Sequence, residues 1–238
     1  MFISDLHLAD MQDPNAQLLL KLLDRVEERN YTHLFLLGDV FDLWIADHKY
    51  FTAKFGPIIE RLVKLSKKCQ VHYFEGNHDL DLRPLFEKKL GIHVHESAYT
   101  TELFGKQVRI EHGDQMDPSD RDYLFLRWFL RTPPMRGLGR ALPGSAVNWI
   151  GETASRKSRA YTTRVRNEIQ AQDVEKKLME HARKAYAKKP FDILIAGHVH
   201  MLLDNATHDY RVINLGTWLD KPTMFTLDGT GGKLEPVE

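Results

Sequence analysis

The sequence lacks several features that would place it in a specialised class of protein. It has one cysteine, Cys69, so no disulfide can form within the chain. Basic and acidic residues are balanced at 33 each, which argues against a general nucleic-acid binder that neutralises phosphates. No run approaches the roughly 18 apolar residues of a membrane span, and no signal-peptide pattern opens the chain. We therefore expect a protein of the reducing cytoplasm, with at most peripheral membrane contact.

The sequence also lacks internal repeats and low-complexity segments. Its 238 residues, of which 42% are hydrophobic, are enough for one domain with an ordinary core and a substantial insertion. The distribution of strand and helix patterns along the chain suggests a core formed by residues 1–118 and 190–238. Residues 119–189 are predicted to form an inserted helical cap that binds substrate, with a helix that returns the chain to the core.

Strand and helix patterns alternate in the first part of the chain. Only the four residues 1–4 precede Asp5, so the first strand is minimal. Asp13-Pro14 then opens an apolar helical stripe that includes Leu19, Leu22 and Val26. Further strands are predicted at Leu34–Leu37 and Val71–Phe74, with a helix at about 53–68 between them. Their apolar runs are continuous enough to be buried on both faces. Later strands are predicted at 99–103, 107–110, 191–195, 211–215 and 224–227.

Five short polar clusters stand where predicted strands end. They are Asp5-Leu6-His7, Gly38-Asp39, Gly76-Asn77-His78-Asp79, His112-Gly113-Asp114 and Gly197-His198-Val199-His200. Mixed carboxylate, amide and imidazole ligands suit a divalent metal such as Mn²⁺, whereas structural zinc usually takes thiolates that this chain lacks. Two cations about 3.5–4 Å apart can activate water for in-line attack on phosphorus. The clusters therefore predict a hydrolytic site with two metals.

The spacing within the clusters suggests their geometry. Asp39, alone after its strand, is the natural carboxylate to bridge two cations. Asp5 and His7 alternate on what we expect to be an extended segment, so both side chains leave the same face, and His198 and His200 repeat the pattern. The glycines let the backbone turn sharply and leave room for metals or phosphate.

In this order, the five clusters resemble the calcineurin-like metallophosphoesterase superfamily. The resemblance implies an α-β-β-α sandwich, an α+β fold of two mixed sheets flanked by helices, with two divalent metals at the carboxyl ends of the strands. It implies that Asp5, His7, Asp39 and His200 hold the first metal. Asp39, Asn77, His112 and His198 would hold the second. It also implies that His78 stabilises the phosphoryl group or protonates the leaving oxygen, with Asp79 orienting it.

Each of these residues also has an ordinary structural interpretation. A single Asp-x-His or strand-end histidine is more often a loop residue than a ligand, and Asp79 could simply cap a turn. Asp42 and Asp114 are better explained as loop residues or as supports for ligands. The remaining histidines lack the strand-end context and are interpreted as structural. These are His33, His48, His72, His93, His95, His181 and His208.

The inserted segment bears on the substrate. A helix beginning at Ser119 carries Phe125, Trp128 and Phe129 and is apolar nearly all round, which favours burial between neighbours. A longer helix should follow Pro143-Gly144, with Val147 and Ile150 on its apolar face. Residues 127–166 carry nine basic residues against the single acid Glu152. Such a run is usually a solvated helix face, but beside exposed aromatic residues it also suits anionic lipid.

A narrower resemblance connects the insertion to lipid chemistry. An aromatic helix after His112-Gly113-Asp114 and the segment Ser155-Arg156-Lys157-Ser158-Arg159 resemble the UDP-2,3-diacylglucosamine pyrophosphohydrolase family of lipid A biosynthesis. This implies an Mn²⁺ enzyme that cleaves a UDP-linked acylated sugar into UMP and the lipid phosphate, peripheral on the inner membrane face. The enterobacterial form has arginine where this chain has His78. The candidate substrate-binding residues are Asn77, His78, Trp128, Ser155, Arg156, Lys157 and Arg159.

Three other functions stay open from the sequence. A phosphoesterase acting on another phosphomonoester, phosphodiester or nucleotide would share the core but gain nothing from an aromatic cap. A nuclease is disfavoured because the basic residues cluster in one inserted segment. A non-enzymatic scaffold would be expected to have lost metal ligands, and this chain has kept them all.

Overall fold

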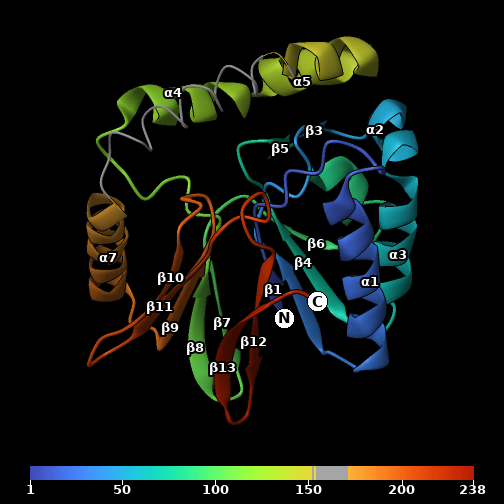
Figure 1. The fold of residues 1–238 in the computed structure, drawn as a ribbon. Helices are drawn as coiled ribbons and strands as arrows, with labels where there is room; N and C mark the ends of the chain where they lie inside the picture. Colours follow the sequence, from blue (N-terminus) through green and yellow to red (C-terminus); the bar gives the residue numbers. More distant parts are fainter. Residues whose placement is uncertain (152, 154–170) are drawn as a thin grey trace.

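The computed structural model describes residues 1–151, 153 and 171–238 and contains two sheets packed face to face (Figure 1). The first sheet has the strand order β13-β12-β1-β2-β4-β6, and β1, β2, β4 and β6 run parallel. Its strands are β1 (Phe2–Ile3), β2 (His33–Leu36), β4 (Gln70–Phe74), β6 (His93–His95), β12 (Thr223–Asp228) and β13 (Gly231–Pro236). The alternation of strands and helices predicted for the first part of the chain is thus confirmed.

The second sheet contains the strands predicted at 99–103, 107–110, 191–195 and 211–215. Its order is β10-β11-β9-β8-β7, with β8, β9 and β11 parallel and the other pairs antiparallel. The strands are β7 (Tyr99–Leu103), β8 (Lys106–Ile110), β9 (Ile193–Ala196), β10 (Leu202–Ala206) and β11 (Arg211–Leu215). Phe2, Phe35 and Phe74 of the first sheet pack against Val108, Ile195 and other residues of the second. Both sheets are therefore mixed, and their facing sides form one core.

Helices cover the outer face of each sheet, as Figure 1 shows. On one side lie α1 (Pro14–Glu28), α2 (Lys49–Lys54) and α3 (Gly56–Ser66), so the single helix predicted for 53–68 is two helices. Asp13 caps α1 by accepting a hydrogen bond from the Asn15 N–H. On the other side, α7 (Ala171–Lys188) packs Leu178 and Ala182 on the second sheet. The predicted α-β-β-α sandwich is confirmed.

Two helices of the predicted cap lie across one end of the sheets (Figure 1). They are α4 (Arg121–Leu130) and α5 (Pro133–Ala141). The cap residue of α4 is Asp120 rather than Ser119, because the Asp120 carboxylate accepts from the Tyr123 N–H. The expectation that α4 is buried between neighbours is wrong: it has no buried residue, and the Phe125 and Trp128 side chains are 63% and 62% exposed.

Residues 144–151 are also helical, but they do not present one apolar face to the core. Val147 is buried against the first core cluster, whereas Trp149 and Ile150 are exposed. The helix α7, predicted to return the chain from the cap, serves as the outer layer of the second sheet. The division into core and cap stays a prediction.

Several short elements were not anticipated. Two two-residue strands, β3 (Trp44–Ile45) and β5 (Asp79–Leu80), pair beside the sandwich, and η1 (Arg83–Glu87) is a π-helical turn. The strands β6, β10 and β13 lie at sheet edges, where polar composition hides the strand pattern. Within the described residues, no helix is both long and apolar enough to span a membrane.

A stack of histidines lies beside the interface between the sheets. The His72 ring stacks on Phe35 at a centroid distance of 4.6 Å and on His93 at 4.9 Å, and its Nδ1 lies 3.0 Å from Nε2 of His95. Burial, together with the neighbouring imidazoles, lowers the pKa of His72 to about 3 and that of His95 to about 4. These rings therefore stay neutral in the folded protein at mildly acidic pH.

Replacing His72 with phenylalanine should make the protein less sensitive to acid. Between pH 6.5 and 4.5 the unfolded chain protonates His72 while the folded chain does not, so acidification lowers the free energy of unfolding. Between these pH values, the free energy of unfolding of H72F should fall by about 1–2 kcal/mol less than that of the wild type. Urea unfolding of chelator-treated protein at both pH values measures it, with the exposed His208→Gln as control. An unchanged pH slope in H72F would contradict the assignment.

Candidate two-metal active site

All five predicted clusters follow strands of the sandwich directly. β1 and β2 precede Asp5 and Asp39, β4 precedes Asn77, and β8 and β9 precede His112 and His198. The first three strands are parallel neighbours in one sheet, and the last two are parallel neighbours in the other. Since parallel strands end at the same edge, the clusters come together at one end of the sandwich.

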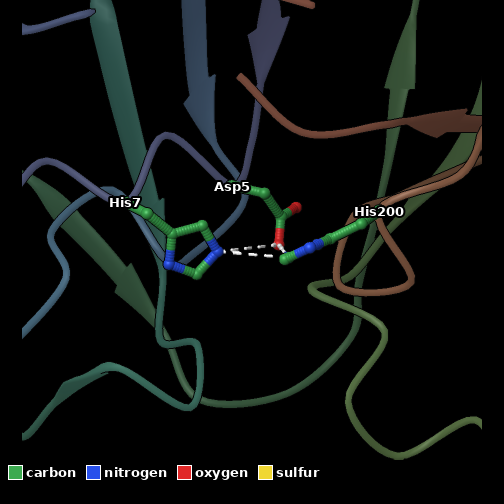
Figure 2. Close-up of side chains that lie close together, drawn as sticks. All are labelled: Asp5, His7 and His200. Atoms are coloured by element: carbon green, nitrogen blue, oxygen red, sulfur yellow. Dashed lines mark hydrogen bonds and ion pairs between the residues drawn. The ribbon is translucent and has the colours of Figure 1, made fainter. Parts of the chain in front are cut away.

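The first group of side chains consists of Asp5, His7 and His200, which Figure 2 shows pointing toward one another. Nε2 of His7 lies 3.1 Å from Nε2 of His200 and 4.0 Å from Oδ1 of Asp5. Nε2 of His200 lies 3.2 Å from the same Asp5 oxygen. One carboxylate oxygen and two imidazole nitrogens therefore meet at a single point.

A second group forms around Asn77 and Asp39. Oδ1 of Asn77 lies 3.2 Å from Nε2 of His112 and 3.1 Å from Nδ1 of His198, and Oδ2 of Asp39 lies 3.6 Å from Nε2 of His112. The same Asp39 oxygen is 4.0 Å from Nε2 of His7, which belongs to the first group. Asp39 thus faces both groups, the position that a bridging carboxylate requires.

The backbone around these ligands differs from the extended segments that we predicted. Asp5 and His7 have φ of 56° and 51°, and His198 and His200 have φ of 69° and 55°. Asp39, with φ of 52°, is also in the left-handed region, which costs non-glycine residues of order 1 kcal/mol or more. The side chains converge because each loop turns sharply, so the alternation argument was wrong. Such strain is typical of functional sites.

Two glycines leave the space that the carboxylates occupy. A Cβ at Gly76 would lie 2.0 Å from Oδ1 of Asp39, and one at Gly197 would lie 2.3 Å from Oδ2 of Asp5. Neither gap could hold a side chain without displacing a carboxylate. Gly76 and Gly197 therefore leave room for the carboxylates, while the predicted room for metals or phosphate stays a prediction.

His78 lies beside the first group, with its ring edge-on to His7 at a centroid distance of 4.9 Å. Its backbone N–H donates to Oδ1 of Asp39, and its Nδ1 is 2.9 Å from the carbonyl oxygen of Asp42. Asp79, expected to orient His78, instead accepts hydrogen bonds from the backbone N–H groups of Asp39, Val40 and Gly76 and from the Tyr73 hydroxyl. The expected role of Asp79 was wrong, because its carboxylate shapes the loops that hold Asp39 and Asn77.

The site holds its imidazoles in different protonation states. Burial lowers the pKa of His7 and of His198 to about 4, so both are neutral ligands at pH 7. Burial also opposes the charge on His112, but Asp39, Asp5 and Asp114 outweigh it and raise its pKa to about 9. Before a cation binds, His112 therefore carries the positive charge that partly balances the carboxylates.

These residues fit divalent cations. Oδ1 of Asp5 and Nδ1 of His7 are buried, and neither has a hydrogen-bond partner of normal geometry among the described residues. Leaving buried polar atoms unpaired is costly unless a ligand satisfies them, and Oδ1 of Asp5 is the oxygen at which the first group converges. The donors are oxygens and imidazole nitrogens, while Cys69 is buried in the hydrophobic core. This set suits Mn²⁺ and similar ions.

Comparison with known proteins decides the family. The family model described as calcineurin-like phosphoesterase matches residues 1–202. The chain belongs to this family. As a calcineurin-like phosphoesterase, it is a metal-dependent hydrolase of phosphoesters or pyrophosphates. A solved structure described as an archaeal phosphodiesterase shares the fold, with a TM-score of 0.51 and 15% identity over 99% of this chain and 97% of that one.

Curated relatives match the phosphoesterase over its whole length. A Porphyromonas gingivalis protein named UDP-2,3-diacylglucosamine hydrolase is 32% identical and is aligned over 100% of this chain and 97% of its own. Proteins with the same name from Pseudomonas putida and Histophilus somni are 30% and 29% identical. The Pseudomonas alignment covers 100% of this chain and 98% of the relative, and the Histophilus alignment covers 97% and 96%.

The described basic residues of the predicted cap do not form the solvated or lipid-facing surface that the charge run suggested. Arg127 pairs with Asp114, Arg131 with Glu75, Arg136 with Glu96 and Asp81, and Arg140 with Asp81. These four arginines attach the helices to the phosphoesterase core. The other candidates, Ser155, Arg156, Lys157 and Arg159, lie outside the described residues, so their role stays a prediction.

Sequence reasoning missed the residues that support the first group from the far end of the chain. After β11, the Thr217 hydroxyl and the Trp218 N–H both donate to the Asp5 carbonyl oxygen. The Asn214 side-chain amide donates to the Gly197 carbonyl oxygen at 2.6 Å. The sequence did contain a sign of this role, because Asn214 and Thr217 are polar residues at the end of an apolar strand. They match none of the metal-binding patterns, however, and so were not selected.

Proposed function

We propose that this phosphoesterase hydrolyses the pyrophosphate of UDP-2,3-diacylglucosamine, giving UMP and 2,3-diacylglucosamine 1-phosphate. The observation that carries the proposal is the position of an exposed aromatic helix, α4, bonded to the loops of a polar site for two metals. A substrate that joins a pyrophosphate to acyl chains needs a polar metal site for the pyrophosphate and an apolar surface for the acyl chains. The full-length similarity to proteins named UDP-2,3-diacylglucosamine hydrolase supports the same substrate.

In this proposal, Asp5, His7, Asp39 and His200 hold one Mn²⁺, and Asp39, Asn77, His112 and His198 hold the other. Bound there, the two cations would supply positive charge against the phosphate oxygens and make water a better nucleophile at neutral pH. Asp5 and Asp39 keep the site anionic, because burial alone would raise their pKa values but the neighbouring histidines hold both below the usual range.

His78 is the proposed catalytic residue outside the two ligand sets. When its Nδ1–H donates to the Asp42 carbonyl oxygen, 2.9 Å away, Nε2 is the ring nitrogen turned to other partners. It would interact with the phosphate or the leaving oxygen, a contribution typically worth about 10²–10⁴ in rate for a general acid.

The cap would receive the lipid part of the substrate. Phe125 and Trp128 contact each other at a centroid distance of 5.6 Å, and Leu126 and Phe129 extend the exposed apolar surface of α4. Ser155, Arg156, Lys157 and Arg159 would bind the second phosphate or the sugar. Residues 119–189 would thus form the substrate cap of a core built from residues 1–118 and 190–238. The same apolar and basic features would hold the enzyme at the cytoplasmic face of an anionic membrane.

The Trp128→Ala variant should raise KM for the acylated substrate about tenfold and leave kcat nearly unchanged. Losing an indole that covers an acyl chain removes about 1–2 kcal/mol of binding common to ground and transition states. Steady-state kinetics with acylated and non-acylated substrates measures the change. Phe104→Ala, which removes an exposed aromatic in the β7–β8 turn, is the matched control. Equal KM values for W128A and F104A would show that Trp128 does not meet the lipid.

One experiment tests the function as a whole. The protein is incubated with Mn²⁺ and UDP-2,3-diacylglucosamine, UDP-glucose or a chromogenic phosphodiester, and UMP or phenol release is followed. We expect rapid UMP release from the acylated substrate alone. Hydrolysis of the phosphodiester without preference for the acylated sugar would identify a general phosphoesterase instead.

A further inference from the structure

Arg127 of α4 and Arg131, which caps the C-terminus of that helix, contact two different loops of the metal site. Arg131 Nη2 donates to the Gly76 carbonyl oxygen at 3.1 Å, and its Nε lies 3.4 Å from the Glu75 carboxylate. Arg127 pairs with Asp114 and donates to the Glu96 carbonyl oxygen at 2.9 Å. The Glu75 and Asp114 side chains are buried, so water does not replace these contacts easily.

These contacts fall on the second group of ligands. Gly76 directly precedes Asn77, and Asp114 follows His112 by two residues, while Tyr123 of α4 donates to Asp114 and lies beside the His198 ring. Within the part of the chain that the structure describes, no hydrogen bond from α4 ends on Asp5, His7 or His200. The helix therefore contacts the loops of the second group and, among the described residues, makes no hydrogen bond to the ligands of the first.

We infer that Arg127 and Arg131 are positioning residues for the second metal, so that the cap helix sets the affinity of that metal and leaves the first metal unaffected. The inference rests on the proposed function of the five clusters as a two-metal site. Asn77 Oδ1 must stay near both His112 and His198, and the two loops that set this spacing are held from outside by α4. Contacts that orient metal ligands typically change metal affinity about 10–100-fold when removed.

The experiment isolates each metal in turn. His200→Ala leaves the second group intact, and His198→Ala leaves the first. Mn²⁺ is titrated calorimetrically into the metal-free full-length protein in each background, with and without Arg131→Met. We expect R131M to weaken Mn²⁺ binding about 10–100-fold in the H200A background and less than about threefold in the H198A background.

Matched variants separate positioning from a general loosening of the cap. Arg136→Met removes an ion pair of α5 with Glu96 and Asp81, neither of which adjoins a ligand, and should change neither metal affinity. If R131M does not fold, Arg127→Lys and Arg131→Lys keep the charge beside Asp114 and Glu75 but shorten the reach to the backbone carbonyls. Each lysine variant should weaken only the second metal.

The outcomes are distinct. Equal weakening of both metals, no weakening, or the same loss in R136M would overturn the inference. Wild-type protein that binds fewer than two Mn²⁺ ions would overturn the two-metal site itself. Two metals bound without hydrolysis of the acylated substrate would refute only the proposed substrate, because the calorimetry uses none.

Discussion

Replacing Asp39 with asparagine should reduce kcat for the acylated substrate by at least about a thousandfold. Oδ2 of Asp39 faces His112 and His7, one from each ligand group, so the substitution removes the negative charge shared by both cations. Asparagine has the same shape and can still accept the His78 N–H, so the fold should persist. A loss of about 4 kcal/mol in transition-state stabilisation corresponds to this factor.

The measurement is kcat at saturating Mn²⁺, with circular dichroism to show that D39N is folded. Asp24→Asn is the control, since Asp24 of α1 pairs with Arg61 of α3 and neither residue belongs to a ligand cluster. His198→Ala should likewise abolish turnover, through the second group alone. If D39N keeps activity within tenfold of wild type in the metal-replete assay, Asp39 is not the carboxylate that bridges the two metals.

Removing divalent metal with a chelator should abolish activity, and Mn²⁺ should restore it. His112, whose pKa is raised to about 9, carries a proton in the metal-free protein at pH 7.5, and a metal can bind its ring nitrogen only after that proton leaves. Metal binding should therefore release about one proton at this pH. The affinity should rise by up to about tenfold per pH unit until pH 9, where His112 is half deprotonated.

Calorimetry in two buffers of different ionisation enthalpy counts the protons, and readdition of Mn²⁺, Mg²⁺ or Zn²⁺ compares the metals. Mn²⁺ should restore the most activity because the donors are mixed oxygen and imidazole nitrogen. Turnover that survives complete metal removal would contradict the two-metal site. A proton count of zero would contradict the charged state of His112.

The sequence predicted the core and the ligand clusters because both depend on local patterns. Apolar strands such as Val71–Phe74 are continuous runs, and polar clusters at the ends of parallel strands must meet. The left-handed backbone at Asp5 and Asp39 could not be predicted, since non-glycine residues rarely adopt it and only the surrounding loops impose it.

Long-range pairing accounts for most of what the sequence could not show. The charge run in the cap looked like a solvated face, but Arg131 and Arg140 find acidic partners more than 50 residues earlier in the chain. The apolar pattern of α4 could not distinguish a buried helix from one that exposes its aromatic side chains. Asp79 matched a motif, but its four hydrogen-bond donors come from two segments, residues 39–40 and 73–76, and none of them belongs to His78.

The pairing of β1 with both β2 and β12 has a consequence for synthesis on the ribosome. Phe2 is opposite Phe225, and the carbonyl oxygen of Asp5 accepts hydrogen bonds from Thr217 and Trp218, so the Asp5 loop depends on residues made more than 200 positions later. A nascent chain that ends before Thr217 lacks both of these hydrogen bonds to the loop that carries Asp5 of the first group. We therefore expect the first group to reach its metal-binding geometry only after the C-terminal strands have been made.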